Sequence, residues 1–207
     1  MSQLITEENA QRELPLDPYH DGLTCKEIEF AEYDMNGHTF DSCIFNLCTF
    51  TNADVSECIF QDCRFNNCRF LMCKMESTVW NNSIFISSRL TGMNFEETSG
   101  FSFYQEYEDC LLESCVFYNN TLKNMYFKKC MIRGSSFQNC PMQGISFVET
   151  QFQDTGFLGC NLEKADFRSA SGYAIDPKAN KLKNARFCLP AAASFLYYLG
   201  ITVEDSF

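Results

Sequence analysis

The sequence predicts an all-β chain that turns sharply every five residues around a filled interior. Two observations support this prediction. A large apolar residue recurs at every fifth position over most of the 207 residues, and the position two residues before it usually holds a small side chain. A period of five matches neither the 3.6-residue period of a helix nor the two-residue period of a strand, so neither element can run for long.

The large apolar positions form two runs. Fourteen of them follow in steps of five from Phe30 to Phe95, and thirteen more run from Tyr107 to Phe167, two residues out of phase with the first run. The position two residues earlier carries 11 of the 13 cysteines. Alternate residues of a short extended segment point the same way, so both positions are expected to face inward. The other three positions of each five are mostly polar and should face water.

These residues resemble the pentapeptide repeat family. The segments CIFNLCTFTNADVSECIFQDCRFNNCRF and CNLEKADFRSA match its five-residue unit, which is a small residue, two free positions, and then Leu or Phe. The resemblance covers residues 23–170 and implies a right-handed quadrilateral β-helix with one repeat per side and twenty residues per coil. The 27 units then make about seven coils, with a length of about 32–34 Å at roughly 4.8 Å per coil. Residues twenty apart should stack, which places Cys43 over Cys63, Cys48 over Cys68, and Cys110 over Cys130.

The segments outside the repeat are expected to close its ends. Residues 1–22 lack the period and contain two prolines, which predicts a short helical or flexible cap. Residues 171–207 start with a loop rich in Lys and Asn, and Pro190 and Gly200 then bracket an apolar helix, followed by a short strand over 201–204. The resemblance implies that this helix caps the last coil and joins a second copy end to end. The expected contacts of this homodimer are Phe195, Leu196, Tyr198 and Leu199.

Composition excludes several classes of protein. An apolar content of 45% with 15% aromatic residues argues against a disordered chain. No stretch approaches the ~20 apolar residues that a membrane-spanning helix needs. The first residues also lack the basic start and apolar run of a secretory signal. Together these features predict a cytoplasmic protein with reduced thiols.

No catalytic, cofactor or metal site is predicted, and we expect no enzyme activity. The cysteines recur at five-residue spacing rather than in C-x-x-C pairs, which favours small packing side chains over zinc ligands or disulfides. His38 stands at an inward position of the first coil and is expected to be a core or capping residue. The sequence contains no G-x-S-x-G motif, no glycine-rich phosphate loop, and no Cys or Ser placed with a His as a nucleophile pair.

The break between the two runs, over residues 96–106, leaves two interpretations open. In the first, Phe101, Phe103, Gln105 and Tyr107 alternate as a short strand while Gly100 takes a tight bend, so the coil only widens. In the second, the break is an acidic aromatic loop that binds a partner, because residues 96–114 hold six acidic side chains and no basic one. The candidate partner-binding residues are Glu96, Glu97, Phe101, Tyr104, Glu106, Glu108 and Asp109.

The resemblance also implies a possible partner. The quinolone-resistance proteins of the family, and an immunity protein against a gyrase-targeting microcin, bind DNA gyrase or topoisomerase IV. They are proposed to imitate DNA with an acidic rod. The present chain has a net charge of -11, and we expect binding of such a partner through an acidic face, without direct contact to nucleic acid. The alternative hypothesis is an interaction scaffold unrelated to topoisomerases.

The distribution of charge limits this comparison with DNA. Nine acidic and two basic side chains lie in residues 1–34, but seven acidic and ten basic ones lie in residues 115–207. Since DNA carries about one charge per 1.7 Å, a rod of about 33 Å would need on the order of 20 negative charges to imitate it fully. We therefore expect an acidic stripe on one face only, with four bases facing elsewhere. These bases are Lys123, Lys128, Lys129 and Arg133.

Overall fold

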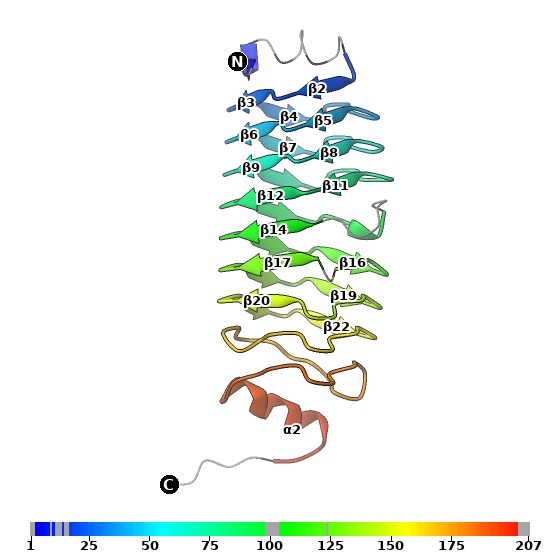
Figure 1. Cartoon of the computed structure of the whole chain (residues 1–207), viewed down its shortest axis with the longest axis vertical. Helices are drawn as coiled ribbons and strands as arrows, with labels where there is room; N and C mark the ends of the chain where they lie inside the picture. The colour runs from blue at the N-terminus through cyan, green and yellow to red at the C-terminus, as the bar shows by residue number, and fades with distance from the viewer. Residues whose placement is uncertain are drawn as a thin grey trace.

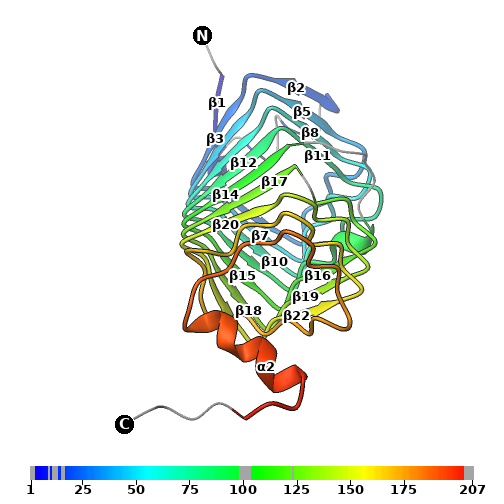
Figure 2. The same cartoon turned by 60° about the horizontal axis from the view of Figure 1, so that its bottom comes forward.

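The computed structural model describes residues 3–8, 10, 14, 17–97, 104–122 and 124–202. Over most of this part of the chain, short strands follow one another at five-residue intervals and pair in parallel with the strand one turn away. The chain therefore winds into a four-sided β-solenoid, seen from the side in Figure 1 and turned toward its C-terminal end in Figure 2. This confirms the predicted fold class, with about seven turns. Parallel bridges twenty residues apart join Gln151 to Ser171, Asn161 to Lys181 and Asp166 to Arg186, so the winding continues past residue 170.

The chain visits the four sides in the same order in each turn, and we number them faces 1 to 4 in that order. Among the described residues, face 1 is an eight-stranded sheet of β1 (Leu4–Thr6), β3 (Thr24–Lys26), β6 (Ile44–Asn46), β9 (Arg64–Asn66), β12 (Ser83–Ile86), β14 (Gln105–Glu108), β17 (Met125–Lys128) and β20 (Ser146–Val148). In the same described part, face 2 is a seven-stranded sheet of β4 (Glu29–Ala31), β7 (Thr49–Thr51), β10 (Arg69–Leu71), β13 (Arg89–Thr91), β15 (Leu111–Glu113), β18 (Met131–Arg133) and β21 (Gln151–Gln153).

The other two sides are less regular. Face 3 begins with parallel bridges that join Asp34, Asp54 and Lys74, and it continues with β16 (Val116–Tyr118), β19 (Ser136–Gln138) and β22 (Gly156–Leu158). Face 4 contains β2 (Tyr19–Asp21), β5 (Thr39–Asp41), β8 (Ile59–Gln61) and β11 (Val79–Asn81) in its N-terminal half. Because the order of the sides is fixed, face 1 lies opposite face 3, and face 2 lies opposite face 4.

The interior is filled by stacked aromatic rings. Phe65, which is fully buried, stacks on Phe45 and Phe85 with ring centroids 4.9 and 4.8 Å apart. The small inward position has a second role, because its polar atom donates to a backbone carbonyl of the preceding turn. The thiol of Cys63 donates to the carbonyl oxygen of Phe40 at 3.2 Å, and the hydroxyl of Ser88 donates to that of Phe65 at 3.0 Å. Thus Cys and Ser suit this position because they are small and also donate a hydrogen bond.

The predicted stacking of cysteines is confirmed. The backbone N–H groups of Arg64, Arg69 and Met131, which each follow a stacked cysteine, donate to the carbonyl oxygens of the cysteines one turn before. All thirteen cysteines are free thiols, and twelve of them are buried. Burial raises the pKa of Cys58 to about 12 and that of Cys73 to about 11. These thiols are therefore protonated and unreactive at neutral pH.

The corners explain the polar residues of the repeat. At most corners a residue just after the strand adopts a left-handed backbone conformation, as in Asn52, Asp62 and Asn67 with φ of 51°, 54° and 53°. Asn and Asp tolerate this conformation better than other residues with a side chain. The chain can therefore turn after three-residue strands without a glycine at every corner.

The break shifts the register by two residues, as predicted. Strand partners are twenty residues apart in regular turns, but Phe85 faces Tyr107 and Leu90 faces Leu112 across the break. Gln105 and Tyr107 both point inward from β14, as the short-strand interpretation expects. That interpretation also invoked Gly100, Phe101 and Phe103, which lie outside the described residues.

Both ends of the solenoid are covered. At the N-terminus, β1 pairs with β3, and Ile5, Ala10 and Leu14 are buried against the core. At the C-terminus, the 3-10 helix η3 (Ala191–Ala193) leads into the α-helix α2 (Ser194–Tyr198), which lies across the last turn (Figure 2). A further 3-10 turn, η2 (Phe95–Glu97), starts the break. Within the described ranges, no helix has the length and apolar character needed to cross a membrane.

Candidate partner-binding surfaces

The candidate residues of the break do not form one surface. Glu96 lies on η2, on face 3, whereas Tyr104, Glu106 and Glu108 lie on or beside β14, on face 1. Asp109 follows at the corner between faces 1 and 2. Phe101 and the side chain of Glu97 lie outside the described residues. Since faces 1 and 3 are opposite sides of the solenoid, a single flat partner cannot contact Glu96 together with Glu106.

The acidic residues after the break are compensated by neighbouring turns. Glu108 pairs with Lys128, with 2.5 Å between Oε1 and Nζ, and Glu113 pairs with Arg133. The expectation that Lys128 and Arg133 face away from the acidic residues was therefore wrong. The strand register explains the error, because each base lies twenty residues after its partner and so sits beside it on the same face.

Two other acidic residues of the break are held by hydroxyl groups. Tyr104 donates from its hydroxyl to Oε2 of Glu106 at 2.7 Å, and Ser87 donates to Oδ2 of Asp109 at 3.0 Å. Desolvation and the neighbouring Glu106 raise the pKa of Tyr104 to about 12. Lys129 follows Asp109 by one turn at the same corner, and Lys123 lies outside the described residues. On face 1 near the break, Glu108 is thus ion-paired, whereas Glu106 and Asp109 accept hydrogen bonds from neutral hydroxyls and keep their negative charge.

The largest group of acidic residues with little compensation among the described residues lies on the N-terminal half of face 3. Asp34 and Asp54 face each other in one column, and Glu76 and Glu96 occupy the parallel column. Glu57 lies at the adjoining corner. We call these five residues the acidic stripe. The only base that contacts it within the described chain is Lys74, whose Nζ lies 3.4 Å from Oδ2 of Asp54.

The C-terminal helix presents one side to the solenoid and one to solvent. Phe195 packs inward, with its ring 4.6 Å from that of Phe187. Leu196 and Tyr198 are half-buried, and Leu199 is exposed. Four exposed apolar residues surround this helix, and we call them the C-terminal patch. They are Leu189, Tyr197, Leu199 and Ile201, with exposed fractions of 81%, 81%, 50% and 49%.

The sequence reasoning missed Tyr197 and included Phe195. The helical spacing alone could not separate them, because both belong to one short apolar segment. The orientation of α2 is set by contacts of Phe195 with Phe187 and Tyr173, which come from the last turn and the loop before it. Of the predicted dimer contacts, Leu199 is therefore the most exposed.

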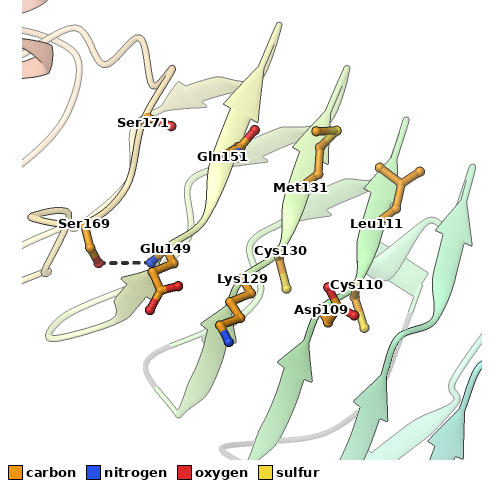
Figure 3. A pocket seen from close by; sticks show the side chains of 10 residues that line it. All are labelled: Asp109, Cys110, Leu111, Lys129, Cys130, Met131, Glu149, Gln151, Ser169 and Ser171. Carbon is orange, nitrogen blue, oxygen red and sulfur yellow. Dashed lines mark hydrogen bonds between the residues drawn. The ribbon is translucent and has the colours of Figure 1, made fainter.

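A shallow groove of about 580 Å³ runs along the corner between faces 1 and 2 in the C-terminal half. Figure 3 shows the corner column Asp109, Lys129, Glu149 and Ser169 beside the strand residues Leu111, Met131, Gln151 and Ser171. The thiols of Cys110 and Cys130 lie below it and are buried. The groove is open and its charges alternate in sign, so nothing in it favours one charged ligand.

The two histidines form a pair on face 4. Nε2 of His20 lies 3.0 Å from Nδ1 of His38, and the His20 ring stacks on Phe40 at 4.7 Å. Burial lowers the pKa of both imidazoles, and for His20 the proximity of His38 lowers it further. Among the described residues, no group of three His, Cys, Asp or Glu side chains is arranged to hold a metal ion.

Comparisons with known proteins agree with this architecture. Among solved structures, QnrB1, a plasmid-mediated fluoroquinolone resistance protein, matches with a TM-score of 0.58 at 15% identity, covering 99% of this chain and 98% of that one. HetL, a pentapeptide repeat protein involved in heterocyst differentiation regulation in the cyanobacterium Nostoc sp. strain PCC 7120, matches with a TM-score of 0.45 at 11% identity, covering 86% and 90%. At 15% identity, the match to QnrB1 shows the fold alone. No curated protein matches the sequence significantly.

Family models give the assignment. The model for pentapeptide repeats in eight copies matches residues 43–79, and the model for a pentapeptide repeat region matches residues 108–187. The two segments together make up more than half of the chain, and both lie in the described solenoid. The chain belongs to the pentapeptide repeat family.

Proposed function

We propose that this protein binds a basic groove of a partner protein through the acidic stripe on face 3, and that the partner is DNA gyrase or topoisomerase IV. The observation that carries the proposal is the stripe itself. Four of its five carboxylates are exposed, Asp54 is half-buried, and within the described chain Lys74 is the one base that contacts it. The fold likeness to QnrB1, a fluoroquinolone resistance protein, supports a topoisomerase as the partner. Binding would then protect the topoisomerase from the drugs that poison it. We also propose that the protein is located in the cytosol, where thiols stay reduced.

The charge density of the stripe suits a groove that normally holds DNA. Glu96 lies about three turns from Asp34, which corresponds to about 14 Å at roughly 4.8 Å per turn. One DNA strand carries a phosphate every ~3.4 Å, or about four over this length. Five carboxylates and one lysine give a net charge close to that of a single DNA strand over the same distance. The proposed mimicry is therefore local and one-sided.

The C-terminal patch is proposed to bind a second copy of the chain. Its residues surround a short helix at the end of the solenoid, so pairing of two identical patches about a twofold axis would give a longer rod with an acidic stripe in each half. The change Leu199→Glu should then give a monomer in sedimentation, whereas Leu47→Glu should not. Leu47 is matched because it is also exposed, by 52%, but lies at a corner of the solenoid. A dimer that survives Leu199→Glu and Tyr197→Glu together would exclude this interface.

The topoisomerase proposal is tested by gyrase supercoiling with a quinolone present. The protein should restore supercoiling at concentrations near that of the enzyme, and a variant with neutralised carboxylates in the acidic stripe should not. The variant combines Asp34→Asn, Asp54→Asn, Glu76→Gln and Glu96→Gln. An amide keeps the carbonyl oxygen that accepts the backbone N–H groups of Asn36 and Ser56, so the turns should remain folded.

A matched control removes the same charge from other faces. It combines Glu29→Gln, Asp41→Asn, Glu149→Gln and Glu163→Gln. This control should protect gyrase like the unmodified protein, since the net charge of both variants is equal and only the position differs. Equal loss in both variants would mean that net charge, not the stripe, is recognised. No effect of the unmodified protein at a hundredfold excess would exclude the topoisomerase, and a pull-down with a single other partner would favour the scaffold hypothesis.

A further inference from the structure

Two arginines face each other on face 2 without a counter-charge. Arg69 on β10 and Arg89 on β13 are direct partners in the register of the sheet. Both side chains are exposed, and within the described chain neither has a hydrogen bond or an ion pair from its guanidinium group. Their backbones are fixed, because each N–H donates to a carbonyl of the preceding turn at 2.9 Å. The backbones of the two arginines are thus fixed at the spacing of neighbouring strands, about 4.8 Å.

The arrangement differs from that of three other cations of the solenoid. Lys74, Lys128 and Arg133 each contact a carboxylate of the adjacent turn. Arg64 on β9 is also exposed without an ion pair in the described chain, but its strand partners are Ile44 and Ile84, so it faces no second cation. Like charges directly opposite each other in a sheet are destabilising. Asp34 and Asp54 are also neighbours of like charge, but Lys74 contacts Asp54, whereas no described residue forms such a contact with the arginines. A local feature that opposes stability without compensation is expected at a functional site.

The surroundings of the pair suit an anion. Thr49 is the strand partner of Arg69 on the other side, and Thr91 follows Arg89 by two residues on the same face, so each arginine has a hydroxyl beside it. The next strand places the apolar Leu111 beside Arg89. Two carboxylates lie diagonally from Arg89, two residues before and two residues after Leu111, and both are engaged elsewhere. Asp109 accepts a hydrogen bond from the hydroxyl of Ser87 at 3.0 Å, and Glu113 pairs with Arg133.

We propose that Arg69 and Arg89 form a binding site for a phosphate group. Each guanidinium presents a planar fork of donors that matches two oxygens of a phosphate or carboxylate. One carboxylate has only two oxygens and one charge, so it can satisfy one fork and leaves the second arginine unpaired. A phosphate has enough oxygens for both forks, and its charge of about -1.5 to -2 at neutral pH matches the two cations. The site lies on face 2 and is independent of the acidic stripe.

The test measures binding of inorganic phosphate and of O-phosphoserine to the full chain by NMR of the arginine Nε–H groups. Two exposed arginines should give a dissociation constant on the order of 1 mM, with shifts confined to Arg69 and Arg89. Acetate should bind at least tenfold more weakly. Binding of both phosphates supports a general phosphate site, and binding of O-phosphoserine alone supports a site for phosphate esters. Equal shifts with acetate, or shifts spread over all arginines, would overturn the proposal.

Variants separate the site from general electrostatics. Arg69→Gln and Arg89→Gln should each weaken phosphate binding at least tenfold. Arg133→Gln is the matched control, because this substitution removes the same charge from the same face. Unlike Arg69 and Arg89, Arg133 is paired with a carboxylate, that of Glu113. Equal weakening in the control would contradict the proposal. Thermal unfolding checks the fold, and neither Arg69→Gln nor Arg89→Gln should lower the Tm, since each relieves a repulsion; a lowered Tm would assign the pair a structural role instead.

Discussion

The break is anchored by a short buried chain of hydrogen bonds, which gives a sharp prediction. Tyr107 is fully buried between Phe85 and Phe127, with ring centroids 4.9 and 5.0 Å apart. Its hydroxyl donates to Oε1 of Gln105 at 2.9 Å, and Nε2 of Gln105 donates to the carbonyl oxygen of Trp80 at 3.2 Å. The change Tyr107→Phe keeps the ring but leaves Oε1 of Gln105 without this donor.

The expected loss follows from the burial of the groups left behind. A buried polar group without a partner costs about 1–3 kcal/mol, so Tyr107→Phe should lower the free energy of unfolding by that amount. Gln105→Leu should cost at least as much, because it leaves both the Tyr107 hydroxyl and the Trp80 carbonyl unpaired. The double variant leaves only the carbonyl unpaired, so its loss should be smaller than the sum of the two by the cost of two unpaired groups, about 2–6 kcal/mol.

Urea unfolding of the four proteins measures this coupling. Tyr126→Phe serves as the control, because Tyr126 lies on the outer side of the neighbouring strand β17 and is half-buried. It should change stability by no more than about 0.5 kcal/mol. Additive losses for Tyr107→Phe and Gln105→Leu would show that the bond contributes nothing, and the break would then need another anchor.

Three further outcomes are expected. A thiol reagent should modify Cys188 alone in the folded protein and the other twelve cysteines only on unfolding. The absorbance of the group that the reagent releases measures this, and reaction of a second thiol before unfolding would contradict the burial of the twelve. The lowered pKa of His20 and His38 means that the unfolded chain binds more protons below about pH 6.5, so the urea midpoint should fall as pH drops from 7.5 to 5.5; a flat profile would refute the shift. Gly172→Ala should lower the free energy of unfolding more than Gly144→Ala, although both glycines have φ above 70°, because only Gly172→Ala places a Cβ against the carbonyl oxygen of Phe152. Equal urea midpoints for the two variants would refute this.

The fold could be predicted because each repeat states the same physical requirement. Phe65 must face inward with Cys63 beside it, and the same requirement recurs five residues later. One atypical residue therefore does not obscure the pattern that predicts the fold. The end of the chain could not be predicted in this detail. Whether Phe195 or Tyr197 faces solvent depends on the contacts of α2 with Phe187, and a five-residue helix has too few positions to define a face by its own periodicity.

The pairing of charges was available in the sequence but was not used. Lys128 follows Glu108 by twenty residues, and Arg133 follows Glu113 by twenty, which is the same offset that correctly predicted the stacked cysteines. Applying that offset to every charged residue would have shown which acidic residues are compensated. It would also have placed Arg69 beside Arg89.

In a four-sided solenoid, distance along the sequence is therefore a poor guide to a binding surface. Residues ten apart, such as Glu96 and Glu106, lie on opposite sides, whereas Asp34 and Asp54, twenty apart, are neighbours. A cluster of acidic residues in the sequence is divided among faces as soon as the chain turns. A partner that approaches one side contacts residues that lie above one another in successive turns. An acidic residue of the break therefore contributes to recognition only if the turns before it also carry acidic residues on that face. This is why the acidic stripe, assembled from four separate turns, supports the proposed binding better than the densely acidic break does.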